Sequence, residues 1–230
     1  MIIKNRFYIG LVIILLLLIY GVIRFPSSLE SPLGLIADGI LVLGYGLLFR
    51  FWIPVLESRQ PEVFRIGTWA GLLIGLIFVV EIVLEYILLP ENNSTMGLIE
   101  YGSVLALFTL IGIGLVYRSN RLRSGVNASI FSALIGSLIW IIAVLSIFHL
   151  FHGTTQQTAV FRAEGNFEDF ASSGSTDFDA FIMQDFWGAI FFHSILLPVF
   201  SIIFGFTGGL IGKSLVWIRD VLRKNSKEVT

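Results

Sequence analysis

The sequence contains no cysteine among its 230 residues. That absence excludes disulfide bonds, thiolate metal sites, iron–sulfur clusters and thiol redox chemistry, although it identifies no compartment. Charged residues are also scarce, at 13% of the chain, where a soluble domain has about 25%. Because 56% of the residues are hydrophobic and the mean hydropathy is +0.88, the missing charge indicates that lipid solvates most of the chain.

Several motifs of known chemistry are missing as well. No His-Glu-x-x-His sequence is present, which argues against an intramembrane metalloprotease of that type. Apart from Lys213, near the C-terminal end of the last run, no lysine falls within an apolar run, which argues against a retinal protein. The glycine-rich stretch 207–214 has Thr207 where a phosphate-binding loop needs glycine. Because no nucleophile–base pair or metal-ligand spacing can be named, an enzyme is the less favoured class.

What the sequence does contain is a series of six apolar runs, each long enough to cross a bilayer, which takes about 20 residues. The first could be a signal peptide, but residues 24–32 offer no small-x-small cleavage site, so we expect it to be retained. The sequence therefore predicts an all-α polytopic membrane protein, with residues 1–230 forming one membrane domain. The expected spans are 7–23, 33–55, 66–89, 97–117, 125–151 and 186–216.

The distribution of cations predicts the orientation of these spans. If the N-terminus lies inside, only Arg24 and Arg162 of the 15 Lys and Arg residues fall on the outer side. Cytoplasmic loops carry the excess of Lys and Arg. We therefore expect both termini in the cytoplasm, an outer loop at 153–184 and a multi-pass protein of the cell membrane.

An internal repeat also appears in the sequence. Residues 44–50 read Gly-Tyr-Gly-Leu-Leu-Phe-Arg, and residues 112–118 read Gly-Ile-Gly-Leu-Val-Tyr-Arg. The two segments close the second and fourth spans, which predicts a weak duplication of helical hairpins, spans two–three and four–five. Repeats of this kind occur in transporters, and also in membrane proteins that transport nothing.

Glycine is concentrated on two helix faces. The pairs Gly205/Gly209 and Gly208/Gly212 in the last span are small-xxx-small patterns, which favour close helix packing or a protein partner in the membrane. In the third span, Gly67, Gly71 and Gly75 share a face with two acids, because each residue turns a helix by about 100°. That face should contact protein or water, since a carboxylate facing lipid is costly.

Acids and histidines gather toward the predicted outer side. Burial would raise the pKa of a carboxylate and lower that of an imidazole, so such groups could titrate near neutrality. Together they could bind a divalent metal, relay protons or hold a cationic ligand. Those near span ends could instead sit at the interface, within reach of water. The candidate pocket residues are Asp38, Glu81, Glu85, Glu100, His149 and His193.

The outer segment 153–184 is acidic and has phenylalanine interleaved along it. It could form a lid over the pocket, a docking surface for a partner, or a loop whose rings rest on the membrane interface.

Three functions remain open from the sequence. The first is a small transport or ligand-binding component with an outward-facing acidic and histidine pocket. The second is a non-catalytic accessory or assembly subunit of a larger membrane complex, and the third is a metal-dependent intramembrane enzyme. The expected partner is the lipid bilayer, with no nucleic acid. Cofactor, metal, substrate, coupling ion and oligomeric state are not determined by the sequence.

Overall fold

The computed structural model describes the backbone of residues 2–88 and 94–228, and within these ranges the chain is helical with no strand. Side chains are described for residues 7–86 and 95–225, so Leu89, the predicted end of the third span, lies outside the described part. The elements in chain order are α1 (Ile2–Arg24), the 3-10 helix η1 (Pro26–Glu30), α2 (Leu33–Arg59), α3 (Pro61–Leu88), α4 (Ser94–Ser119), α5 (Leu122–Leu150), α6 (Thr155–Ala163), α7 (Asn166–Ser173) and α8 (Phe178–Glu228).

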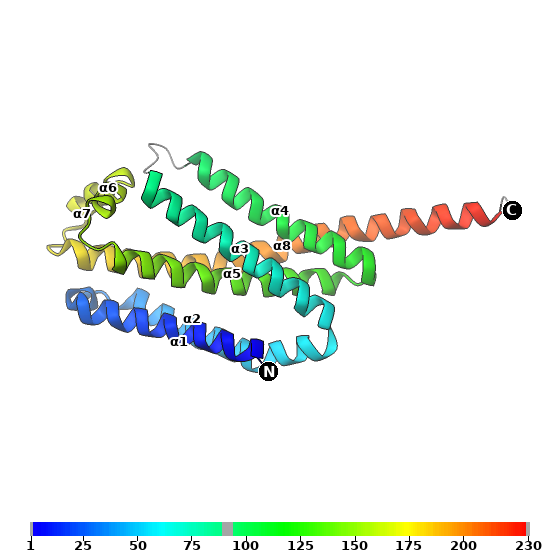
Figure 1. Ribbon diagram of the computed structural model, residues 1–230, viewed down its shortest axis with the longest axis horizontal. Helices are drawn as coiled ribbons and strands as arrows, with labels where there is room; N and C mark the ends of the chain where they lie inside the picture. The colour runs from blue at the N-terminus through cyan, green and yellow to red at the C-terminus, as the bar shows by residue number, and fades with distance from the viewer. Residues whose placement is uncertain (1, 89–93, 229–230) are drawn as a thin grey trace.

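Six of these helices are long and apolar enough to cross a membrane, which confirms the predicted fold class. They lie roughly side by side in an elongated bundle, while the last part of α8 extends beyond the other helices (Figure 1). The candidate spans are Phe7–Arg24, Leu33–Arg59, Pro61–Tyr86, Thr95–Ser119, Leu122–Leu150 and Phe178–Asn225.

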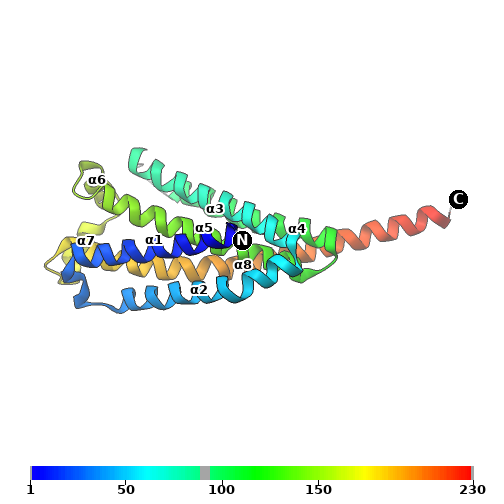
Figure 2. The same ribbon diagram turned by 60° about the horizontal axis from the view of Figure 1, so that its bottom comes forward.

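The centre of the bundle is α5, which contacts α1, α3, α4 and α8 (Figures 1 and 2). Most of its residues between 124 and 138 are buried. This segment is apolar or small around its whole circumference, as expected of a helix enclosed by others. Small residues such as Ala128, Ser132 and Gly136 allow the neighbouring helices to approach closely.

The glycine face of α3 packs against α5, as the sequence predicts. A Cβ added at Gly67 would lie 2.9 Å from Cδ1 of Phe131, and one added at Gly71 would lie 2.6 Å from Cβ of Ile135. Real Cβ atoms do not approach other atoms so closely, so the packing of α3 on α5 depends on glycine at both positions.

Glycine also determines how α8 packs. A Cβ at Gly212 would lie 2.7 Å from the carbonyl oxygen of Ile113, and a Cβ at Gly208 would collide with the carbonyl oxygen of Thr109. Both contacts are with α4. The small-xxx-small pattern of the last span is therefore occupied within this chain.

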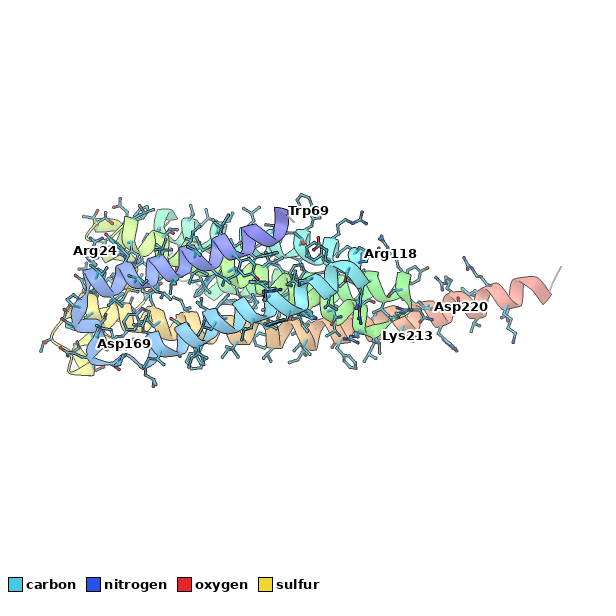
Figure 3. The ribbon with its side chains drawn as sticks, turned by 90° about the horizontal axis from the view of Figure 1, so that it is seen from below. Arg24, Trp69, Arg118, Asp169, Lys213 and Asp220 are labelled. Carbon is cyan, nitrogen blue, oxygen red and sulfur yellow. The ribbon has the colours of Figure 1, made fainter. Side chains whose placement is uncertain are left out.

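The end of the bundle from which α8 projects is held together by cations (Figure 3). Arg118 of α4 pairs with Glu62 of α3, with Nη1 and Oε1 3.2 Å apart. Lys213 of α8 donates to the turn between α4 and α5, at 3.0 Å to the carbonyl oxygen of Asn120 and 2.6 Å to its Oδ1. Asn120 has a φ of 57°, a conformation that asparagine tolerates better than most residues.

At the opposite end, the predicted outer segment is mostly helical. α6 and α7 are joined at Gly165, which has a φ of 81°, and α8 begins at Phe178. The backbone N–H of Ala180 donates to Oδ1 of Asp177 at 3.1 Å, which satisfies a free donor of the first turn. The last part of the segment 153–184 is therefore continuous with the sixth span.

Two sets of contacts fix α6 and α7 in place. Gln157, which is 2% exposed, donates from Nε2 to the carbonyl oxygen of Phe148 at 2.9 Å and accepts from the N–H of Gly153 at 3.1 Å. The ring of Phe178 stacks on Phe167 and packs edge-on against Phe170, with centroids 4.6 and 5.2 Å apart. These phenylalanine rings pack on one another and hold α7 against the start of α8.

Candidate functional site

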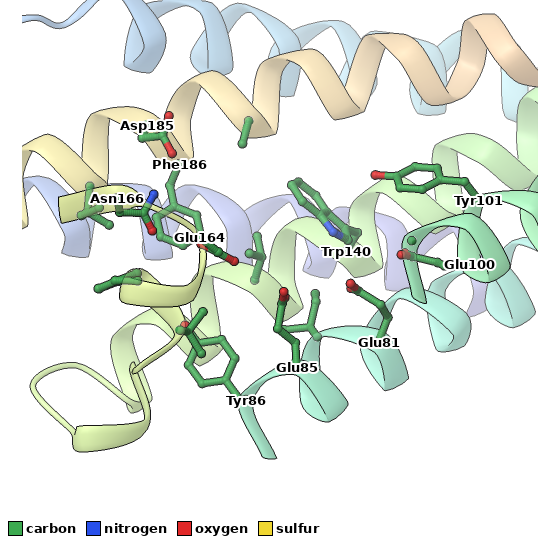
Figure 4. A pocket seen from close by; sticks show the side chains of 17 residues that line it. Glu81, Glu85, Tyr86, Glu100, Tyr101, Trp140, Glu164, Asn166, Asp185 and Phe186 are labelled. Atoms are coloured by element: carbon green, nitrogen blue, oxygen red, sulfur yellow. The ribbon is translucent and has the colours of Figure 1, made fainter. Parts of the chain in front are cut away.

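The acidic pocket lies at the α6–α7 end of the bundle, between α3, α4, α5, α8 and the α6–α7 connection (Figure 4). Its volume is about 340 Å³, which is within the range of small-molecule sites. Its walls combine carboxylates with aromatic rings, so it is neither a purely apolar void nor an open polar surface.

Five carboxylates line the acidic pocket, and the described residues around it include no Arg or Lys. Glu81 and Glu85 are one turn apart on α3, which places both on the same side of that helix. The other three come from different parts of the chain: Glu100 from α4, Glu164 from the α6–α7 connection and Asp185 from α8.

Glu100 is the most enclosed of these acids. It is only 7% exposed, and it accepts no hydrogen bond from the described part of the chain. Its carboxylate and that of Glu81 both extend into the pocket, from α4 and α3 respectively (Figure 4). An enclosed carboxylate without a donor is expensive to ionise, so the pocket contains an acceptor for which the protein supplies no partner.

Aromatic rings cover the rest of the wall. The rings that line the pocket are those of Tyr86, Tyr101, Trp140, Phe161 and Phe186. An aromatic face attracts a cation within about 6 Å of its centroid, and tryptophan does so most strongly. Carboxylates and ring faces in one cavity both favour positive charge.

His193 lies behind Trp140, whose indole ring separates it from the acidic pocket. Its imidazole stacks on Trp140, with centroids 4.0 Å apart and planes inclined by 12°, and it meets Phe78 edge-on at 4.9 Å. Its Nε2 is buried with no hydrogen-bond partner in the described residues. His193 therefore supports the indole ring that faces the pocket and does not itself line it.

The other two predicted residues lie elsewhere. Asp38 of α2 is fully buried, and neither carboxylate oxygen has a hydrogen-bond partner among the described residues. His149 of α5 packs edge-on against Tyr20 of α1 at 4.8 Å. The structure thus brings Glu81, Glu85 and Glu100 together, places His193 behind the pocket, and leaves Asp38 and His149 outside its lining.

Two acids of the pocket were not among the candidates chosen from the sequence. Glu164 belongs to the segment expected to be an outer loop, and Asp185 lies just before the predicted start of the sixth span. Both reach the pocket because Gly165 turns the chain back and α8 begins early. The glycine directly after Glu164 was the one available signal.

The pKa of Glu164 is raised from 4.5 to about 7. Desolvation by the surrounding atoms is the largest cause; the residue is also exposed to solvent, which reduces the shift. The negative charges of Glu85, Asp185 and Glu81 add to the effect. Glu164 therefore changes its charge near neutral pH.

The carboxylates surround a space and do not converge on a point. Among the described residues, no group of three or more His, Asp or Glu side chains is placed to hold one metal ion. This spacing suits a cation whose charge is spread over several atoms better than a compact ion, which needs several oxygen ligands at about 2 to 2.6 Å.

Comparison of the chain with protein-family models, with curated proteins and with solved structures gives no match. The geometry of the pocket is therefore the basis for the functional argument.

Proposed function

We propose that this membrane protein binds an organic cation, an amine or a quaternary ammonium group, in the acidic pocket, as a small transport or ligand-binding component. The observation that carries the proposal is Glu100, a carboxylate that is 7% exposed, has no donor among the described residues and faces a cavity of about 340 Å³. A bound cation would supply the missing partner.

The aromatic wall supports an organic cation in particular. Trp140 and Tyr101 present their side chains to the same cavity as Glu81 and Glu100 (Figure 4). Each cation–π contact contributes about 0.5 to 2 kcal/mol, with the higher values at desolvated sites. The apolar groups of an alkylated ammonium would also gain from contact with these rings, which a hydrated metal ion would not.

The position of the pocket agrees with uptake from outside. The pocket is lined by residues of α6 and of the α6–α7 connection, and Asp169 of α7 lies at the end of the bundle opposite Arg118 and Lys213 (Figure 3). If the cationic end faces the cytoplasm, as Lys and Arg distributions in membrane proteins favour, the pocket faces outward. Its negative charge would then concentrate cations at that surface.

The accessory-subunit alternative has less support. It relied on glycine faces being available to a partner, but Gly205, Gly208 and Gly212 contact α4 and α5 of this chain. The pocket has no role in that alternative, whereas it is the central feature of a ligand-binding protein.

Calorimetric titration with tetraethylammonium, on protein purified in dodecyl maltoside, tests the proposal. We expect saturable binding, weakened at least about tenfold in Glu100→Gln, because a hydrogen bond or ion pair with a charged group contributes about 1.5 to 3 kcal/mol. Glu57→Gln is the matched control. Glu57 is an exposed acid near the C-terminal end of α2 and does not line the pocket, so this variant should bind the cation normally. No saturable binding, or equal affinity in the two variants, would overturn the proposal.

A further inference from the structure

A second hollow, the apolar groove, lies on the outer surface of the bundle between α3 and α4. Its volume is about 500 Å³, and its walls are almost entirely apolar. Leu76 and Val80 of α3 and Ile99 of α4 line it, and these side chains are 55%, 46% and 65% exposed. In a six-span bundle such side chains face the acyl chains, so this groove opens sideways into the bilayer.

Glu81 and Glu100 are the residues common to the acidic pocket and the apolar groove. Both cavities therefore meet at a pair of carboxylates, of which Glu100 is more than nine-tenths buried and has no hydrogen-bond partner among the described residues. A carboxylate at the edge of a lipid-facing groove is costly unless a cation or donor reaches it. The aqueous side can supply one through the pocket, and the lipid side can supply one through the groove.

The shape and charge of the groove restrict what could fill it. A neutral acyl chain would cover the leucine and valine side chains but would leave both carboxylates unpartnered. A small hydrated cation would neutralise the two carboxylates but would leave the apolar side chains of the groove uncovered by the ligand. One molecule satisfies both requirements when its cationic head is joined to an apolar tail.

We propose that the ligand is a cationic amphiphile, which places its ammonium head between Glu81 and Glu100 and its single apolar chain along the groove between α3 and α4. This inference rests on the proposed function, since the head occupies the acidic pocket. It adds that the ligand enters from the bilayer, by lateral movement between the two helices.

The test compares a short and a long ammonium ion on groove variants. The probes are tetraethylammonium and dodecyltrimethylammonium, titrated into protein in dodecyl maltoside. Val80→Trp and Ile99→Trp each fill the groove from one wall, at positions exposed enough to accept a larger ring. Leu43→Trp is the matched control, because Leu43 is 71% exposed on α2 and lies away from the groove.

We expect dodecyltrimethylammonium to compete with tetraethylammonium for one site. Its affinity should fall at least tenfold in Val80→Trp and Ile99→Trp, while tetraethylammonium binds these variants within about twofold of the wild type. Leu43→Trp should change neither affinity. Partition of the long probe into the micelle is the same for every variant, so differences between variants report on the site.

Two outcomes would overturn the inference, and they are distinguishable. If tetraethylammonium binds but the groove variants leave dodecyltrimethylammonium binding unchanged, the ligand is a short cation and only the proposed function stands. If neither probe binds the wild type, the proposed function fails together with this inference.

Discussion

Individual carboxylates line the acidic pocket, and the pKa of Glu164, which lies outside the membrane spans, is near neutral pH. Its pKa of about 7 lies above its ordinary value of 4.5, chiefly because the pocket walls desolvate it. Between pH 4.5 and 7 the carboxyl group of Glu164 is therefore protonated in the folded state and ionised in the unfolded chain. Stability depends on that difference in bound protons, so the contribution of Glu164 falls as the pH rises through this window.

Glu164→Gln should flatten this dependence. We expect the variant to have a higher Tm than the wild type at pH 8, where the folded wild type must carry the ionised carboxylate, and the difference should shrink as the pH falls toward 4.5. Thermal unfolding in detergent across that range measures it. Glu168→Gln, an exposed acid outside the pocket lining, is the control. Parallel pH profiles for wild type and Glu164→Gln would contradict the assignment.

For single residues, the sequence was sufficient to predict the direction of some candidate side chains and not of others. Glu81 and Glu85 could be assigned to a protein-facing side of their helix because a helix has a fixed angular period. The depth of Asp38 and His149 could be estimated too, but their direction could not. α5 is buried around most of its circumference, and α2 is apolar on its exposed face as well as on its buried face, so amphipathic periodicity leaves the rotation of these two residues undetermined.

Among the elements, the contact between α4 and α8 depends most directly on side-chain size. Gly208→Ala should lower the Tm, because the new Cβ would collide with the carbonyl oxygen of Thr109 and force the helices apart. Overpacking of this kind costs about 1 to 3 kcal/mol.

Gly114→Ala provides the comparison on the same helix pair. No atom lies within 4 Å of a Cβ at this position, so the substitution should be neutral or stabilising by up to about 1 kcal/mol, the helix-propensity difference. Thermal unfolding of both variants, monitored by circular dichroism, measures the contrast. Equal Tm values would show that the α4–α8 contact does not constrain the helix spacing.

The internal repeat illustrates how far an element can be understood from its sequence. Gly44 and Gly112 occupy the same position in the repeated heptapeptide. A Cβ at Gly44 would meet nothing within 4 Å, whereas one at Gly112 would collide with the carbonyl oxygen of Gly205. Similar segments can therefore lie in different environments, because the neighbours of a helix come from distant parts of the chain.

Dependence on contacts with other parts of the chain also explains why α6 and α7 were not predicted from the sequence. Hydropathy identifies a helix that crosses lipid, and all six such helices were recognised in the sequence. α6 and α7 are short, and contacts such as those of Gln157 with Phe148 and Gly153 hold them in place. Such contacts exist only once the bundle has formed, so the part of the pocket that they build was invisible to sequence patterns.

For the molecule as a whole, the untested prediction is its sidedness. Because the chain has no cysteine, single-cysteine variants can be labelled without background. In intact cells, Ser172→Cys on α7 should react with a membrane-impermeant maleimide. Ser58→Cys, near the end of α2, should react only after permeabilisation; both serines are exposed. The reverse pattern would place the acidic pocket on the cytoplasmic side and remove the argument for uptake from outside.

α8 has a mechanical consequence for the whole molecule. With 51 residues at about 1.5 Å each it is roughly 76 Å long, more than twice the thickness of the lipid core at about 30 Å. Asp185 lies near one end of α8, and the other end of the helix projects past the rest of the bundle (Figure 1). The glycine contacts of α8 with α4 and α5 lie between these two ends. Because one continuous helix joins the pocket to the projecting end, a change in the tilt of α8 on ligand binding would displace that end farther than it displaces Asp185.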